Sequence, residues 1–366
     1  KDSLLYYPYE SMEPFLRLVK EASEDPAVLS IQITLYRIDT NSRLAAYLIE
    51  AAEKGKVVTV LMELRARFDE QNNIAWAERL EEAGCRILYG FDGMKVHSKI
   101  CLITRREKNK LQYITQIGTG NYSEKTARLY SDFSLMTVSE EIGRDAMLFF
   151  KNMSIANLNG EYSTLLVAPG GFKRRILGLI DLEIQKALSG TPAQLLFKMN
   201  SLTDREIIDK LQAASQVGVR VILIVRGICC ILPGVPTLTE NISVTSVVGR
   251  FLEHARVYSF GEGEQAQVYL ASADLMTRNT ERRVEIACPV LDAELKRRVL
   301  HILQIQRSDH AKARMLLPDG NYGAAAPNGE KVLDCQQYFM DEATRNAGKP
   351  SVNRPPFLDR LLNKFR

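Results

Sequence analysis

The sequence predicts an α/β fold made of two tandem domains with mixed, mainly parallel sheets flanked by helices. Apolar runs rich in β-branched residues alternate with runs of helical period, and the order strand, helix, strand occurs twice along the chain. A chain of 366 residues is also longer than one hydrophobic core usually supports. These observations favour two domains built from βαβ units.

The first half of the chain contains four apolar runs that we interpret as strands. The predicted strands cover 28–36, 57–64, 85–91 and 96–104. The segments between them have helical periodicity, at 42–55 and 73–84, and the second ends at Gly84, a residue type that often ends helices. Strands joined through helices are expected to pair in parallel.

The second half repeats this order, with predicted elements at 194–202 (strand), 203–218 (helix) and 219–227 (strand). Aligning LIEAAEKGKVVTVLMEL with KLQAASQVGVRVILIVR places Gly55 on Gly218, 163 residues later. We therefore predict two related domains, 1–160 and 161–318, although two unrelated βαβ units would also look alike. Residues 319–366 are expected to form a linker and tail with little role in chemistry.

Composition excludes several classes of protein. The net charge is only +4, so any functional positive charge must be local. The six cysteines show neither CxxC pairs nor zinc spacing, which favours a reducing, cytoplasmic compartment. No apolar stretch approaches the length of a transmembrane helix, and the first residues lack the pattern of a signal peptide and read as the interior of a longer protein.

Two histidines stand in the same motif, followed after one residue by a cation. His97 precedes Lys99 in VHSK, and His254 precedes Arg256 in EHAR, 157 residues later. On a strand, residues i and i+2 point to the same face, so each imidazole would lie beside a fixed positive charge. That pair suits attack on a phosphate. A single His-x-Lys is usually structural, but its duplication in register with the repeat favours a functional site.

Further residues in both halves favour an anionic ligand. A polar turn follows each motif, and the first of them, GTGN, ends at Asn121 after two glycines that permit close backbone approach to an oxyanion. Arginines also follow the predicted strands, at Arg37, Arg65, Arg67 and Arg226. Ligands of α/β sheets bind beyond the strand ends, and arginine binds phosphate in a bidentate manner. Aromatic residues rarely interleave with the basic ones, so we predict a polyanionic substrate and no nucleic acid.

Seven motifs carry a family resemblance. LMELRARFDE, VHSKICLI, GTGNYSEKTARLYSDFS, SLTDREIIDKL, LIVRGICC, NISVTSVVGRFLEHARVYSF and SADLMTRNTERRVE closely resemble the polyphosphate kinases of the phosphohistidine type, over about residues 1–320. That family is similar to the phospholipase D superfamily, in which two His-x-Lys motifs face each other across a domain interface. The resemblance implies two tandem phospholipase D-like domains. The superfamily's Asp after Lys99 is not visible, and Arg256 replaces the second Lys.

The resemblance assigns roles to individual residues. His97 would be the phosphorylated nucleophile, beside Lys99, while His254 would act on the leaving or entering phosphate oxygen and contact ATP. Tyr130 and Arg226 match the ATP-contacting positions. Arg37 and Arg67 match positions associated with Mg²⁺, where we expect them to hold the phosphates that carry the ion, since arginine is a poor metal ligand. Arg65, Asn121 and Arg256 complete the predicted phosphate- and polyphosphate-binding set.

The implied function is reversible transfer of the ATP γ-phosphate to the end of a polyphosphate chain through a phosphohistidine. The expected partners are ATP, ADP and polyphosphate, with Mg²⁺ as cofactor. Full-length relatives carry an N-terminal helical domain and a head domain upstream, so a homo-oligomer is expected for the full-length enzyme. The expected location is the cytoplasm, and the full-length enzyme could also associate with a membrane. The alternatives are a phospholipase D-like phosphodiesterase and a non-catalytic polyphosphate-binding fragment.

Overall fold

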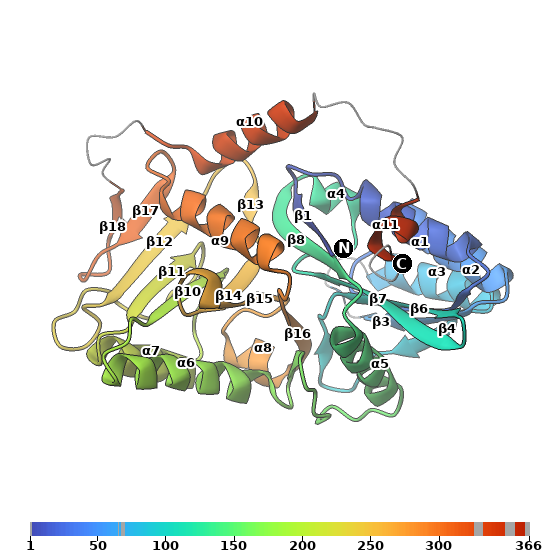
Figure 1. Ribbon diagram of the computed structural model, residues 1–366, viewed down its shortest axis with the longest axis horizontal. Helices are drawn as coiled ribbons and strands as arrows, with labels where there is room; N and C mark the ends of the chain where they lie inside the picture. The colour runs from blue at the N-terminus through green and yellow to red at the C-terminus, as the bar shows by residue number, and fades with distance from the viewer. Residues whose placement is uncertain (1, 65, 67–69, 326–331, 348–355, 363–366) are drawn as a thin grey trace.

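The computed structural model of the protein describes residues 2–64, 66, 70–325, 332–347 and 356–362. Its two β-sheets lie side by side along the long axis of the molecule, and helices flank each of them (Figure 1). The predicted architecture of two α/β halves with mixed sheets is therefore confirmed.

The first sheet belongs mainly to the first half of the chain. Its strand order is β1 (Ser3–Tyr7), β8 (Tyr130–Thr137), β7 (Lys110–Gly118), β6 (Ile100–Glu107), β2 (Val28–Leu35), β3 (Val57–Met62) and β4 (Arg86–Tyr89). One face is covered by α1 (Glu13–Glu24), α2 (Arg43–Glu53) and α3 (Glu70–Glu82), and the other by α5 (Glu140–Ser154). The short α4 (Glu124–Ala127) precedes β8. Strand residues alternate between the two cores, as side chains of successive strand positions must.

The second sheet belongs mainly to the second half. Its strand order is β18 (Tyr322–Ala324), β17 (Ala313–Leu316), β12 (Ile242–Val247), β11 (Arg220–Val225), β10 (Gln194–Met199), β14 (Arg256–Phe260), β15 (Gln267–Ala271), β16 (Arg283–Pro289) and β5 (Lys95–Val96), with β9 (Leu166–Ala168) also on β16. One face is covered by α6 (Phe172–Leu188) and α7 (Arg205–Gln216), and the other by α9 (Ala293–Arg307). Two short helices, η1 (Gly263–Gln265) and α8 (Thr277–Glu281), lie between strands.

Antiparallel pairs outnumber parallel pairs in both sheets, so the expectation of mainly parallel sheets is corrected. Parallel pairing holds for β2, β3 and β4 and for β10, β11 and β12, the strands joined through helices or long loops. By contrast, β6 and β7 are joined by only Lys108 and Asn109, both at positive φ. So short a connection can make only a hairpin, and a hairpin is antiparallel.

The repeat predicted from the sequence has a structural counterpart. The unit β2, α2, β3 corresponds to the unit β10, α7, β11, and both contain parallel neighbouring strands. Gly55 and Gly218 follow the two helices with φ of +83° and +91°, a left-handed conformation that glycine adopts without strain. The predicted boundary at residues 160 and 161 lies between α5 and β9.

The two halves exchange one short strand each. β5 leaves the first half and pairs in parallel with β16, where Val96 lies opposite Val284. β13 (Leu252–Glu253) leaves the second half and pairs in parallel with β8, where Glu253 lies opposite Ser131. Each exchanged strand ends directly before one of the two motif histidines. The sheet of one half therefore positions the histidine of the other half.

The C-terminal segment is folded rather than a simple tail. It contributes β18, α10 (Cys335–Ala347) and α11 (Phe357–Leu362). α11 packs on α1, where the Glu21 carboxylate accepts hydrogen bonds from the backbone N–H groups of Phe357 and Leu358 at 3.0 and 2.7 Å. α10 packs near β13 and α9 (Figure 1). Among all these described helices, none combines the length and apolar character that a membrane span requires.

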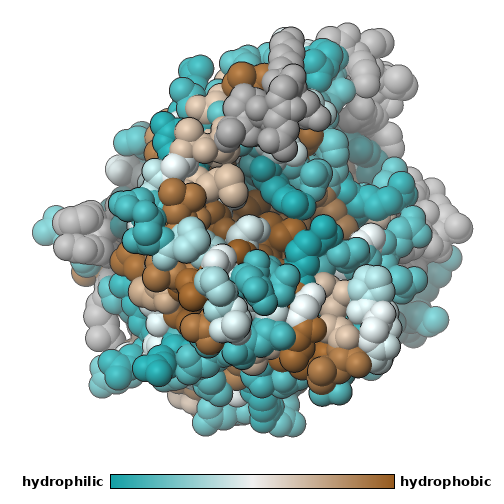
Figure 2. Space-filling view, turned by 90° about the vertical axis from the view of Figure 1, so that its left-hand side faces the viewer, coloured by the Kyte–Doolittle hydropathy of each residue, from teal (hydrophilic) through white to brown (hydrophobic). Residues whose placement is uncertain are grey.

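Figure 2 shows the end of the molecule that lies at the left in Figure 1, formed by β17, β18 and the loop after β11. Hydrophobic side chains gather there among hydrophilic ones. Large apolar side chains exposed in these segments include Ile228, Leu232, Met315 and Tyr322. This end lies away from the exchanged strands, so it does not form the histidine site.

Candidate functional site

His97 is held by a carboxylate from the opposite half of the chain. Its Nδ1 lies 3.0 and 2.9 Å from the two carboxylate oxygens of Glu285 on β16. Glu285 is fully buried and also accepts hydrogen bonds from the hydroxyl of Ser272 and, at 2.7 Å, from Nδ2 of Asn279. The imidazole is thereby fixed in orientation, with Nδ1 turned to the acid.

His254 has the matching arrangement in reverse. Its Nδ1 lies 2.9 and 3.0 Å from the carboxylate oxygens of Asp132 on β8, and Asp132 accepts a hydrogen bond from the Thr119 hydroxyl at 2.6 Å. Tyr130 contacts this imidazole, with ring centroids 5.3 Å apart. Thr119 and Asp132 precede Ser272 and Glu285 by the same 153 residues. The site therefore contains two imidazole–carboxylate pairs that the sequence repeat relates to each other.

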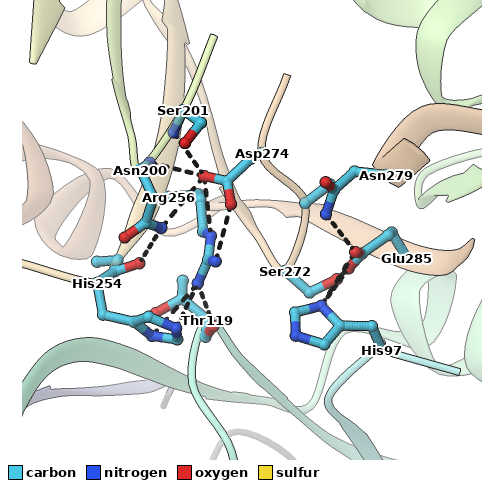
Figure 3. A network of polar contacts seen from close by, with 12 residues as sticks. His97, Thr119, Asn200, Ser201, His254, Arg256, Ser272, Asp274, Asn279 and Glu285 are labelled. Carbon is cyan, nitrogen blue, oxygen red and sulfur yellow. Dashed lines mark hydrogen bonds and ion pairs between the residues drawn. The ribbon is translucent and has the colours of Figure 1, made fainter. Parts of the chain in front are cut away.

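Arg256 lies between the second histidine and a third acid (Figure 3). Its Nε and Nη2 donate to the Asp274 carboxylate at 3.3 and 3.0 Å, and its Nη1 lies 3.0 Å from Nε2 of His254. Asp274 also accepts hydrogen bonds from the backbone and side-chain nitrogens of Asn200 at 2.6 and 3.1 Å. The guanidinium is buried, so its positive charge is stabilised by the Asp274 carboxylate in place of water.

Lys99 is buried beneath the other histidine. Its Nζ donates to the carbonyl oxygen of His97 and lies 5.4 Å from the centroid of the Tyr36 ring. Burial holds the pKa of Lys99 well below its ordinary value; Glu285 partly offsets this, while Arg256 adds to the depression. An anion that enters the site would stabilise the charged ammonium, which suits a phosphate-binding role.

Both histidines are neutral in this environment. Burial lowers the pKa of His97 to about 3, and Lys99 and Arg256 add to this effect against the attraction of Glu285. Burial, followed by Arg256, also lowers the pKa of His254. Burial alone would raise the pKa of Asp132 and of Glu285, but their histidine and cationic partners lower it, so both acids are ionised. Each imidazole then donates Nδ1–H to its carboxylate and keeps a lone pair on Nε2.

The two lone pairs are not equivalent. Nη1 of Arg256 lies 3.0 Å from Nε2 and 3.2 Å from Nδ1 of His254, so this cation covers both ring nitrogens. Nε2 of His97 has no hydrogen-bond partner among the described residues, and Figure 3 shows this nitrogen directed away from Glu285. The geometry therefore offers one available nucleophile, His97, with a second histidine whose lone pair is engaged by a cation.

The structure brings most of the predicted site residues together. Arg226 donates from Nε to Asn200, and its pKa is lowered by burial and then by the neighbouring Arg256. Arg37 lies beside Tyr36, with its guanidinium 5.9 Å from the ring centroid. The Tyr36 ring in turn contacts the imidazole of His97, with centroids 5.0 Å apart.

Three further predicted site residues, Asn121, Arg65 and Arg67, make no described contact with the two histidines. Oδ1 of Asn121 is buried and has no hydrogen-bond partner among the described residues, an arrangement open to a ligand. Arg65 and Arg67 lie outside the described residues, so their predicted roles stay predictions.

The position of Arg226 carries a residue of opposite charge in the first half of the chain. β3 and β11 correspond residue by residue, so Glu63 takes the place of Arg226 directly after the strand. Glu63 accepts the backbone N–H of Val96 at 2.8 Å and thereby anchors β5. The same position thus fixes the strand before His97 in one half and supplies a cation in the other.

Sequence reasoning missed the acids that orient the site, Asp132, Asp274 and Glu285. A signal for two of them was present, because Asp132 and Glu285 share the repeat spacing of the polar turns and each begins an apolar run. Their partners lie 122 and 188 residues away in sequence, across the interface between the halves. Only the strand exchange reveals the pairing.

No group of three or more His, Cys, Asp or Glu side chains in the described part of the chain could hold a metal ion. Asp132, Asp274 and Glu285 are instead engaged by histidine, arginine and hydroxyl donors. The six cysteines are free thiols.

The depressed pKa of His97 predicts how stability depends on pH. An unfolded histidine titrates near pH 6.5. Because the folded pKa is about 3, the unfolded chain binds more protons between these values, so stability should fall as the pH drops through this window. We expect the His97→Gln variant, whose amide can still donate to Glu285, to lose less stability than the parent between about pH 6.5 and 4. Urea unfolding across this pH range measures the free energy of unfolding of both proteins. An equal fall in stability for the parent and for His97→Gln would contradict the depressed pKa of His97.

Two family models match the chain: Polyphosphate kinase C-terminal domain 1 over residues 1–158 and Polyphosphate kinase C-terminal domain 2 over residues 165–336. The chain is 46% identical over 345 residues to the polyphosphate kinase of Staphylococcus haemolyticus (strain JCSC1435), covering 94% of this chain and 48% of that protein. The crystal structure of polyphosphate kinase from Porphyromonas gingivalis matches with a TM-score of 0.87 and 38% identity, covering 94% of this chain and 53% of that one.

A more distant structure shares the fold alone. The crystal structure of phosphatidylserine synthase from Haemophilus influenzae Rd KW20 matches with a TM-score of 0.59 at 13% identity, covering 94% of this chain and 93% of that one. The chain spans about half the length of the curated relatives it matches. From the two family models, the relatives and the solved structure, the chain belongs to the polyphosphate kinase family, of which it carries the two C-terminal domains.

Proposed function

We propose that this chain transfers the γ-phosphoryl group of Mg-ATP to the end of a polyphosphate chain, reversibly, through a phosphohistidine at His97. The observation that carries the proposal is the available Nε2 of a neutral imidazole, fixed by Glu285 and surrounded by buried cations. A nucleophile that carries no proton on the attacking atom needs no separate base.

The first half-reaction forms one bond and breaks one. Nε2 of His97 attacks the γ-phosphorus in line, an N–P bond forms, and the P–O bond to ADP breaks. The ring keeps its proton on Nδ1 and gains positive charge, which the ionised Glu285 stabilises at 2.9 Å. In the second half-reaction, a terminal oxygen of polyphosphate attacks the phosphorus and the N–P bond breaks, which restores neutral His97.

His254 and its neighbours suit the oxygen side of this transfer. The Arg256 guanidinium and the His254 imidazole form one unit through the 3.0 Å contact between Nη1 and Nε2. This unit can bind the oxygen that leaves ADP or enters from polyphosphate, and it can exchange a proton with that oxygen. Tyr130 and Arg226 flank the unit and are proposed to contact ATP.

Magnesium enters this account as part of the Mg-ATP substrate. Arginine does not ligate a cation, so Arg37 and, by resemblance, Arg67 are proposed to bind the phosphate oxygens that carry the ion. Arg37 directly follows Tyr36, whose ring contacts the His97 imidazole, and this supports a role for Arg37 on the His97 side. Mg²⁺ offsets charge on the transferring phosphoryl group, a task it would share with Lys99 and Arg256.

Other features of full-length relatives also remain proposals for this chain. By resemblance, the upstream domains contribute an adenine contact and a homo-oligomer interface. A cytoplasmic location is proposed on the same ground and on the cysteine pattern. Turnover by these two domains alone is expected to be slower than that of a full-length relative, because part of the nucleotide contact is absent.

The test is covalent labelling with γ-³²P-ATP and Mg²⁺. We expect label that is labile in acid and stable in base, and none in the His97→Ala variant. His301→Ala is the matched control, since His301 lies on the exposed side of α9 and should leave labelling unchanged. Label in His97→Ala would overturn the proposal. Polyphosphate binding without label would support a binding fragment, and hydrolysis of a chromogenic phosphodiester without ATP would support a phosphodiesterase.

A further inference from the structure

We propose that Gln336, in the C-terminal helix α10, is a positioning residue for His254. Its kinetic consequence rests on the proposed function, while its structural consequence does not. Gln336 is buried, and its side-chain amide reaches the segment that leads into β13. The C-terminal segment, which the sequence suggested was remote from chemistry, would thus be part of the site.

The Gln336 amide pairs with the backbone as a neighbouring strand would. Phe251 N–H donates to Oε1 of Gln336 at 3.0 Å, and Nε2 of Gln336 donates to the Phe251 carbonyl at 2.9 Å. The same Nε2 donates to the Glu253 carboxylate at 2.8 Å. One amide therefore fixes both ends of a three-residue segment that ends directly before His254. β13 pairs with β8 on its other side, so it is held from two directions.

The Glu253 carboxylate is the centre of this arrangement. It is buried and accepts hydrogen bonds from the Ser131 hydroxyl and from Nε2 of Gln306, both at 2.7 Å. The buried ammonium of Lys198 lies 3.1 Å away. Residues of β8, β10, α9 and α10 thus meet at the Glu253 side chain, and these elements come from both halves of the chain. Because Ser131 directly precedes Asp132, these contacts fix both His254 and the carboxylate that orients it.

His97 has no such support from α10. The residue before it is Val96, whose side chain is apolar and whose N–H is held by Glu63 within the first half. Disturbing Gln336 should therefore alter His254 and leave His97 unchanged. A purely structural role for Gln336 would instead lower the stability of the whole domain without distinguishing the two histidines.

Two variants disturb the contact from opposite sides. Gln336→Ala removes the amide. Gly249→Ala places a Cβ 2.5 Å from Oε1 of Gln336, so the amide must shift away from Phe251 and Glu253. Gln337→Ala is the matched control, because Gln337 is the exposed neighbour on the same helix and its hydrogen bonds within the described residues go to Asp334 and Asp341.

The experiment is ¹⁵N NMR of the whole chain labelled at histidine, which has only four such residues. In the parent and in Gln337→Ala we expect His97 and His254 as single Nδ1–H tautomers. In both disturbing variants, His254 should become a mixture of tautomers while His97 keeps its signals. Unchanged His254 signals in both folded variants would overturn the proposal, as would equal changes at the two histidines.

Kinetics supply the second readout. A displacement of about 1 Å in a catalytic group can cost on the order of 100-fold in rate. We expect kcat for polyphosphate synthesis to fall about 10- to 100-fold in both variants, with a smaller change in KM. Unchanged kcat in both variants would contradict the kinetic consequence. A parent chain that takes up no label would refute the proposed function instead, and the NMR result would still decide the role of Gln336.

Discussion

Replacing Glu285 by glutamine should slow phosphoryl transfer to His97 by about three to four orders of magnitude, the size of effect seen when the acid behind a catalytic histidine becomes an amide. Glu285 accepts hydrogen bonds from His97, Ser272 and Asn279 with two oxygens, whereas glutamine offers these three donors one acceptor oxygen and turns an amide nitrogen to the others. The amide would instead donate to Nδ1 of His97 and move the ring proton to Nε2. The variant therefore removes the nucleophilic lone pair while it keeps the shape of the side chain.

Single-turnover labelling with γ-³²P-ATP measures this rate, and ¹⁵N NMR reports the tautomer of His97. The control is Glu262→Gln, which removes an exposed carboxylate paired with Arg220 and should leave the rate unchanged. A rate for Glu285→Gln within about tenfold of the parent would show that Glu285 does not set the tautomer.

Replacing Arg256 by alanine should destabilise the chain by about 3–5 kcal/mol, because it leaves the buried Asp274 carboxylate without its ionic partner. The pKa of Asp274 lies below its ordinary value, through Arg256 and the Asn200 hydrogen bonds acting against burial. This stabilisation is present above the unfolded pKa, near 3.9, and is lost as the pH falls through the folded value. The difference in the free energy of unfolding between Arg256→Ala and the parent should therefore become smaller at acidic pH.

Urea unfolding gives the free energy difference. Arg205→Ala is the comparison, since it breaks an exposed pair with Asp209 and should cost no more than about 1 kcal/mol. Arg256→Lys, which matches the cation that the first half carries at Lys99, should retain part of the stability. Equal losses for Arg256→Ala and Arg205→Ala would contradict the importance assigned to the buried pair.

Much of the fold could be predicted from the sequence because it depends on local patterns. The β2, α2, β3 unit follows from the apolar run 28–36, the helical period over 42–55 and the turn at Gly55. The two histidines could be singled out for a related reason, since a repeated fold repeats its motifs at a similar spacing. Both inferences need only residues close together in sequence and one long-range alignment.

The rest depends on contacts that no local pattern encodes. β5 and β13 contain two residues each, too few to show a period, yet they decide which acid reaches which histidine. The prediction of mainly parallel sheets is wrong where β6 turns back into β7 through Lys108 and Asn109, because a hairpin turn makes an antiparallel pair. The contact of Gln336 with Glu253 joins positions 83 residues apart and has no periodic signal.

The most direct test of the account is to locate the phosphoryl group after incubation with Mg-ATP. Trypsin should release Val96–Lys99 and Phe251–Arg256, which separate the two histidines, and mass spectrometry at neutral to basic pH can identify the modified peptide and ring nitrogen. We predict the phosphoryl group on Nε2 of His97, because Nδ1 faces Glu285 and Nε2 of His254 is engaged by Arg256. A phosphoryl group on the His254 peptide, or on Nδ1 of His97, would contradict the account.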